Sequence, residues 1–161
     1  MEWKRYVLSS VAGILMVLQI VLILFCGQGD LKILRYIGYA LWIVGAFFGW
    51  YPIFYLRQKG RVKKGESYVH TKVLVDSGIY SVVRHPQYLS FFFLIVALIL
   101  VAQDWLNTLI GLIAVFLFYI DTSQADQSLI EKFGNNYRHY MKRVPRLNFF
   151  IGIIRRLQDK K

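Results

Sequence analysis

An uncharged run of 19 residues, Val7–Phe25, constrains this chain more than any other feature of its sequence. At a rise of about 1.5 Å per residue, a helix of that length spans about 28 Å, which matches the hydrocarbon thickness of a bilayer. Hydrophobic residues make up 57% of the 161 residues, and 12 Phe, 11 Tyr and 4 Trp exceed what a soluble domain of this size carries. The sequence therefore predicts an all-α, polytopic membrane protein.

Three further apolar segments are expected to complete the membrane-embedded part. The first is Ile33–Leu56, in which Trp50 and Tyr51 suit a membrane interface. The shorter runs Leu89–Ala102 and Leu106–Ile120 lie close together in the chain and predict a tight helical hairpin. We therefore expect four transmembrane helices, the last two of which form that hairpin.

The chain is expected to form a single membrane-embedded domain with four regions. These are two N-terminal spans in 1–56, a cytosolic basic loop and the start of a ligand site in 57–86, the helical hairpin in 87–122, and a cytosolic or interfacial helical tail that completes the site in 123–161. Within the tail, Gly134 is expected to end one helix before the next begins. The segment Leu147–Leu157 mixes Phe and Ile with arginines, as a helix lying in the headgroup plane does.

The basic residues indicate the orientation of the chain in its membrane. With 20 Lys and Arg against 9 Asp and Glu, the formal net charge is +11. Basic residues crowd 57–64, the tail and the pair Lys4 and Arg5, whereas 28–32 and 103–107 nearly lack them. The positive-inside rule therefore places both termini and the ligand site on the cytoplasmic side. Topology and attraction to anionic headgroups account for the charge, so no nucleic-acid partner is expected.

The sequence offers neither a metal site nor a set of residues for nucleophilic catalysis. The lone Cys26 excludes an internal disulfide, and His70, His85 and His139 are scattered instead of spaced as metal ligands. The Gly-rich segment GRVKKG lies in a basic loop without a preceding strand, so it does not predict a nucleotide-binding turn. No obligate protein partner is inferred either.

The segment Gly78–Ser90, GIYSVVRHPQYLS, places cations at the start of the third apolar helix. Pro86 suits a first helical turn, where its missing N–H costs nothing. Arg84 and His85 then stand at the helix N-terminus, where free backbone N–H groups attract a carboxylate or a phosphate. The same residues also suit a simple interfacial anchor that holds the helix at its depth, and the residues alone leave both interpretations open.

This segment resembles the Gly-Pro-Tyr-Arg-…-Arg-His-Pro-x-Tyr-x-Gly signature of the isoprenylcysteine carboxyl methyltransferase family and its phospholipid methyltransferase relatives. A second segment, ADQSLIEKFGNNYRHY at 125–140, resembles the Glu-Glu-x-x-Leu-x-x-x-Phe-Gly-x-x-Tyr-x-x-Tyr block of that family, and Arg143-Val144-Pro145 resembles the end of the block. The two blocks flank the predicted hairpin in the order that the family has. The resemblance covers Val73 to Phe150, about half of the chain.

The resemblance implies methyl transfer from S-adenosylmethionine to a lipophilic acceptor at the cytoplasmic membrane face, with S-adenosylhomocysteine as the product. The acceptor would come sideways from the lipid bilayer. Carboxylate, amine and thiol acceptors all occur among relatives of the signature, so a phospholipid N-methyltransferase or a thiol or amine methyltransferase is the alternative. A non-catalytic membrane scaffold that binds anionic lipid is the alternative of a different class.

Carried over position by position, the resemblance also implies the site residues. The cofactor-binding residues would be Gly78, Tyr80, His85, Pro86, Gln87, Tyr88, Asp126 and Leu129. The catalytic residues, which would orient the acceptor, would be Arg84, Arg143 and Arg146. A carboxylate such as Asp126 suits the ribose hydroxyls, and aromatic faces suit the sulfonium. Arg143 and Arg146 also suit a stripe that binds lipid headgroups, so this alternative stays open.

The chain departs from the family pattern at several positions. Ile79 replaces the common Pro, Ser90 the terminal Gly, Ala125 and Asp126 the acidic pair, and Asn148 the Pro near the end. The side chain of Asp126 is shorter than that of the family Glu and reaches less far. If a departure indicates an altered activity, it is the one at Asp126.

We predict that both ends of the chain lie on the cytoplasmic side of the membrane. The even number of expected spans and the basic segment 57–64 are the reasons. A reporter fused after Lys161 should be active only in the cytoplasm, and a reporter inserted in 28–32 should be active only outside. Activity of the Lys161 fusion on the outer side alone would contradict this orientation.

Overall fold

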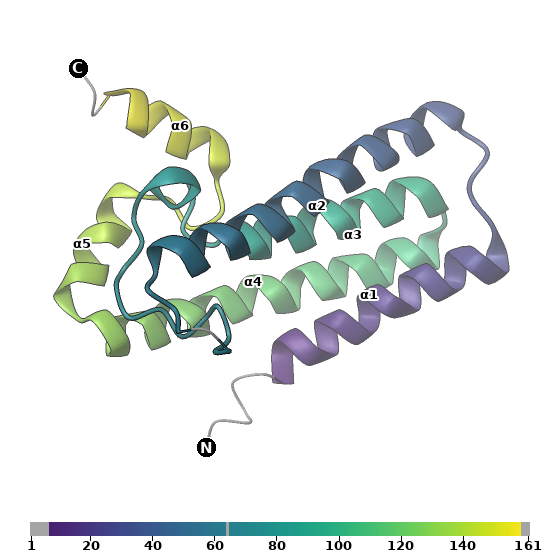
Figure 1. Ribbon diagram of the computed structural model, residues 1–161. Helices are drawn as coiled ribbons and strands as arrows, with labels where there is room; N and C mark the ends of the chain where they lie inside the picture. The colour runs from purple at the N-terminus through teal and green to yellow at the C-terminus, as the bar shows by residue number, and fades with distance from the viewer. Residues whose placement is uncertain (1–6, 64, 159–161) are drawn as a thin grey trace. The chain divides into compact units, whose positions relative to one another are not determined.

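A computed structural model describes residues 7–63 and 65–158 of the protein. Within these ranges the chain is helical and contains no strand, as predicted (Figure 1). Lys4, Arg5 and Lys64, which contributed to the predicted orientation, lie outside the described residues, as does the end of the chain from Asp159. The helices are α1 Val7–Cys26, α2 Lys32–Lys59, α3 Pro86–Ala102, α4 Trp105–Phe133, α5 Asn135–Arg143 and α6 Phe149–Gln158.

Three helices, α1, α2 and α4, are long and apolar enough to cross a membrane. Helix α3 is equally apolar but has only 17 residues, so the expected count of four spans is not confirmed. Only Gln103 and Asp104 separate α3 from α4, which gives the tight connection expected for a hairpin. Apolar helices of this length indicate an integral membrane protein.

One helix boundary agrees with the sequence prediction, and another differs from it. Helix α3 begins at Pro86, as predicted, because proline fits the first helical turn. Helix α4 does not end near Ile120, where its apolar run ends, but continues to Phe133. The polar residues beyond this run had indicated a surface segment, yet Asp121 and Thr122 are buried. The proposed border between the hairpin and the tail therefore lies inside one continuous helix.

The chain divides into two compact units. One unit comprises the described residues up to Phe47 together with Ser90–Gln124, and the other comprises Phe48–Leu89 together with the described residues from Ala125 onward. The residue pattern of each unit is different. The first is built from the apolar helical segments, whereas the second contains most of the sequence that the two family-like blocks cover.

In the first unit, α1 packs through very few of its side chains. Its buried residues are Ala12 and Gln19, while Leu24 and Phe25 are exposed. The amide of Gln19 donates to the side-chain oxygen of Asn107 on α4 at 2.8 Å, and the Asn107 amide donates to the Gln19 carbonyl at 3.0 Å. An otherwise apolar helix suits a lipid surrounding, and the two residues pair inside the bundle, although Gln19 Oε1 has no hydrogen-bond partner among the described residues.

In the second unit, a small core forms around α5. Tyr137, Tyr140 and Val144 are buried and pack against partly buried apolar residues of α4, among them Leu129 and Phe133. Gly134 separates α4 from α5 with a backbone φ of +59°, a conformation that glycine adopts without strain. The predicted helix break at Gly134 is therefore confirmed, and it turns α5 back onto α4.

Candidate functional site

The site centres on the buried carboxylate of Asp126 on α4. Its side chain is 4% exposed and accepts hydrogen bonds from four other side chains. Oδ1 accepts from Tyr137 Oη at 2.6 Å, His85 Nε2 at 2.8 Å and Arg84 Nη1 at 3.3 Å, and Oδ2 accepts from Arg146 Nε at 2.9 Å. The structure thus joins residues of both family-like blocks at a single carboxylate.

Backbone hydrogen bonds hold the two arginine-bearing segments side by side. The Arg84 N–H donates to the Pro145 carbonyl at 3.0 Å, and the His85 N–H donates to the Arg146 carbonyl at 3.2 Å. Helix α5 ends at Arg143, and the following Val144 is extended, so the chain leaves the helix and runs along the residues that precede α3. Arg84 and Arg146 therefore approach Asp126 from two non-helical segments that these backbone hydrogen bonds hold together.

Two tyrosines of α5 stabilise this arrangement through hydrogen bonds. The Tyr137 hydroxyl donates to Asp126, and the Tyr140 hydroxyl donates to the Tyr80 carbonyl at 2.5 Å. Burial, followed by the hydrogen bond to Asp126, raises the pKa of the Tyr137 hydroxyl above its ordinary range. Burial is also the main cause that raises the pKa of Tyr140. Both hydroxyls therefore stay protonated near neutral pH and act as donors.

The cluster carries more positive than negative charge. Arg84 and Arg146 contribute two guanidinium charges against the one carboxylate of Asp126, before any protonation of His85. Arg84 is 9% exposed, and its Nε is a buried donor without a hydrogen-bond partner among the described residues. A buried cation and a buried donor both need a partner, so the cluster suits an additional anionic acceptor.

Most of the other predicted site residues lie near this cluster in sequence and space. Pro86 is buried as the first residue of α3, and Gln87 and Tyr88 follow it, half-buried, in the first turn. The Tyr88 ring stands edge-on to the His85 ring, with the centroids 5.7 Å apart. A helix N-terminus, two basic residues and an aromatic ring thus occur together, as the sequence predicted.

Gly78 and Tyr80 lie in a 3-10 helix, Gly78–Ser81, that precedes the cluster. Gly78 has a φ of +60°, and a Cβ there would come within 2.5 Å of the Tyr55 ring, so only glycine fits. Tyr80 is buried, and its ring lies 6.4 Å from that of Tyr55. Both residues shape the segment that leads to Arg84.

Two predicted site residues are not brought to Asp126. Leu129 packs in the core around Tyr137 and Tyr140. The side chain of Arg143 is 61% exposed and forms an ion pair with Asp76 at 3.2 Å. Arg143 is the last residue of α5, whereas Arg146 follows the extended turn, so the two arginines point to different places.

Sequence reasoning missed the roles of Tyr137 and Tyr140 as hydrogen-bond donors. In the sequence both fit the apolar face of a helix, and both are buried. Their spacing of three residues places both hydroxyls on the same side of a short helix. That spacing, together with a buried acid on the preceding helix, is the signal that indicates such donors. Among the described residues, no group of His, Cys, Asp and Glu is arranged to hold a metal ion.

We predict that Asp126→Asn lowers the free energy of unfolding by about 3–5 kcal/mol, because it leaves Arg84 buried beside a neutral partner. Glu131→Gln is the matched control: Glu131 lies on the same helix but is exposed, as expected, and its loss should change stability by about 0.5 kcal/mol or less. Chemical unfolding in detergent measures both variants. Equal stabilities would show that the cluster does not hold the fold.

Comparison with known proteins gives relatives of one kind. The chain is 30% identical over 100 residues to the protein-S-isoprenylcysteine O-methyltransferase of Schizosaccharomyces pombe, which covers 56% of this chain and 42% of that protein. It is 33% identical over 94 residues to the proteins of that name from Mus musculus and Homo sapiens, which covers 57% of this chain and 32% of each relative. The chain thus spans less than half the length of these relatives. No solved structure matches it.

The family assignment rests on the match of a family model. The model of the Isoprenylcysteine carboxyl methyltransferase (ICMT) family matches residues 43–131, more than half of the chain. This range includes Arg84, His85 and Asp126, whereas Tyr137 and Arg146 follow it. The predicted family is therefore confirmed: the chain belongs to the isoprenylcysteine carboxyl methyltransferase family.

Proposed function

We propose that this protein transfers a methyl group from S-adenosylmethionine to the carboxylate of a lipophilic, isoprenylcysteine-like acceptor at the cytoplasmic membrane face. The observation that carries the proposal is the cluster at Asp126, because it joins both family-like blocks around a surplus of positive charge. The names of the relatives support the reaction class, and the apolar helices support an acceptor that partitions into lipid. S-Adenosylmethionine would supply the methyl group on its sulfonium.

The methionyl carboxylate of the cofactor fits the region of Arg84, His85 and the start of α3. The Arg84 Nε is a buried donor that has no acceptor among the described residues, and the surplus charge of the cluster favours an anion. The first turn of a helix of 17 residues adds backbone N–H groups and the positive end of its dipole. In this proposal the Tyr88 ring, edge-on to His85, forms one wall.

Asp126 would act mainly as a positioning residue. A carboxylate offers about four lone-pair sites, and the three hydrogen bonds at Oδ1 exhaust that oxygen. Oδ2 accepts one hydrogen bond from Arg146, so it has capacity for one more donor, such as a ribose hydroxyl. The expected contact with the ribose stays a prediction, and it would be a single hydrogen bond.

Arg146 suits the acceptor carboxylate better than Arg143 does. Its Nε donates to Asp126, which fixes the guanidinium, and its side chain is 29% exposed, so part of it is accessible. Arg143 is paired with Asp76 on the surface and is less restrained. Methyl transfer from a sulfonium is a displacement in which the protein mainly positions a desolvated nucleophile and excludes water. A fixed arginine at the edge of a buried cluster meets both needs.

We predict that Arg84→Lys weakens S-adenosylhomocysteine binding about tenfold or more, which corresponds to about 1.4 kcal/mol. Lysine keeps the charge beside Asp126 but removes Nε and the planar fork. Isothermal titration of the detergent-purified protein measures the affinity, and the exposed Arg57→Lys is the control that should bind like wild type. Wild-type protein that does not bind S-adenosylhomocysteine would refute the proposed cofactor and favour a scaffold.

A second prediction concerns the acceptor. The protein should methylate a small S-isoprenylated cysteine with a free carboxylate, yield a methyl ester that mild base cleaves to methanol, and fail with the preformed ester. Arg146→Lys should lower kcat/KM about tenfold or more, because the bidentate fork is lost, and the exposed Arg138→Lys should not. Base-stable methylation of phosphatidylethanolamine would instead identify a phospholipid N-methyltransferase.

A further inference from the structure

Helix α6, Phe149–Gln158, has two opposite faces. At about 100° per residue, Gly152 projects to one side of the helix, flanked by Arg155 and Arg156. Phe150, Ile154 and Leu157 project to the other side, with intervals of four and three residues that keep them in a row. The helix is therefore amphipathic, with Gly152 and the two arginines on one face and the apolar row on the other.

The face with Gly152 is bound to the protein. Gly152 is buried directly against the Val82 carbonyl, so that a Cβ at this position would overlap the oxygen. Arg156 Nη1 donates to the Gly78 carbonyl at 3.0 Å, and the Phe149 ring packs edge-on against Phe48 on α2, with the centroids 5.3 Å apart. These contacts fix which side of α6 faces outward.

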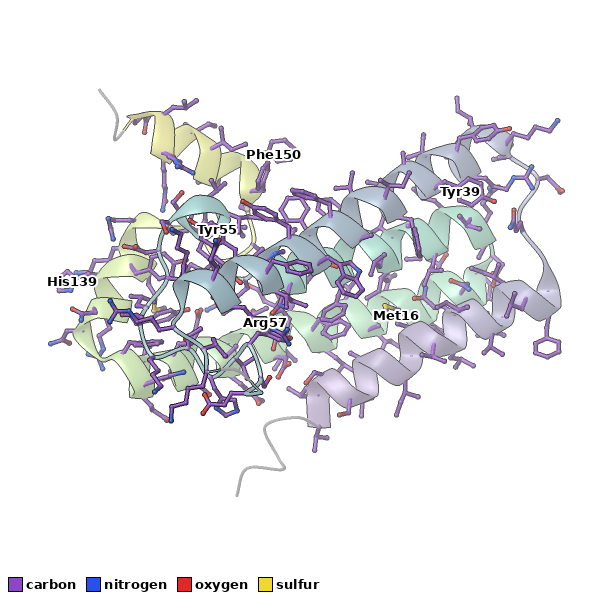
Figure 2. The ribbon with its side chains drawn as sticks, in the orientation of Figure 1. Met16, Tyr39, Tyr55, Arg57, His139 and Phe150 are labelled. Carbon is purple, nitrogen blue, oxygen red and sulfur yellow. The ribbon has the colours of Figure 1, made fainter. Side chains whose placement is uncertain are left out.

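The opposite face is apolar and uncovered by any described segment. Phe150 is 78% exposed, Leu157 61% and Ile154 55%. Figure 2 shows Phe150 projecting from the start of α6. An apolar row of this size marks a surface that contacts something other than water.

The contact between α6 and α2 indicates what that surface meets. Phe149 packs on Phe48, and two residues later α2 carries Trp50 and Tyr51, which suit a membrane interface and are exposed. Helix α6 therefore starts at the depth where α2 is expected to leave the lipid. The segment 57–64 and the tail are rich in basic residues, so an anionic headgroup layer is complementary in charge to this part of the chain.

We propose that α6 lies in the interface of the lipid bilayer, with Phe150, Ile154 and Leu157 among the acyl chains of an anionic leaflet. Helices of this type insert by their apolar face and are held by basic residues at the headgroups. Because Gly152 and Arg156 bind the backbone of Val82 and Gly78, the lipid would also hold the segment that leads to Arg84. The proposal does not depend on the methyltransferase activity.

Site-directed spin labelling of the full chain tests this placement. In a Cys26→Ser background, which removes the free thiol, single cysteines replace Phe150, Ile154 or Leu157, and Arg138→Cys on α5 is the exposed control. Each labelled protein is reconstituted into phosphatidylcholine–phosphatidylglycerol vesicles. The three α6 labels should be more accessible to oxygen and less accessible to an aqueous nickel chelate than the label at position 138.

Two outcomes would overturn the proposal. Nickel accessibility at positions 150, 154 and 157 equal to that at 138 would place α6 in water. Spin–spin broadening between labels, lost on dilution with unlabelled protein, would show that a second copy of the chain covers the row. Circular dichroism of each labelled protein checks that the helix content is unchanged, and the labels replace exposed side chains only.

Discussion

Burial of the Asp126 carboxylate is the interaction on which the second unit depends. An ionised carboxylate at this depth would be strongly unfavourable without charged and hydrogen-bonding partners. Its partners lie 42 and 41 residues before it, at Arg84 and His85, and 11 and 20 residues after it, at Tyr137 and Arg146. The acid can therefore be buried only when the segment before α3 and the tail after α5 reach it together. The Asp126 carboxylate thus links α4 to the segment before α3, to α5 and to the residues after α5.

The two units differ in the polar groups that they bury and in how much apolar surface they expose. In the first, α1 exposes nearly all of its apolar surface, and the buried polar pair Gln19 and Asn107 is neutral. Neutral amides that pair with each other fit a hydrocarbon surrounding better than ions do. In the second unit, Arg84 and Asp126 are buried beside Tyr137. The first unit also buries one acid, Asp121, so charged groups are not confined to the second.

The helices and the start of the site could be predicted from sequence because they follow from local rules. Uncharged runs give α1 and α2, Pro86 marks the start of α3, and Gly134 marks the break before α5. The length of α4 could not be predicted in this way, because Asp121 and Thr122 look like surface residues until their burial is known. The Thr122 hydroxyl donates to the Tyr119 carbonyl one turn earlier, so its hydrogen bond is satisfied inside the helix.

Arg143 and Arg146 also show what could not be predicted from the sequence at the site. Three residues apart in a basic tail, they look equivalent in sequence, and both were expected to orient the acceptor. Val144 and Pro145 separate them: α5 ends at Arg143, Val144 is extended, and Arg146 reaches Asp126. The direction of a side chain after a helix end depends on where the chain goes next, which local pattern does not specify.

The geometry of the cluster explains how Asp126 can stand where the family has Glu. The shorter side chain had suggested a loss of reach, yet both of its oxygens bind donors, at 2.6 and 2.8 Å on Oδ1 and 2.9 Å on Oδ2. A side chain longer by one methylene would have to push α4 away from Tyr137 and His85 or bend out of their plane. Asp126 therefore suits a cluster in which the donors have come close to α4. In the proposed function, the ligand would meet the surplus positive charge and the Arg84 Nε, which has no partner among the described residues, and neither depends on the reach of the acid.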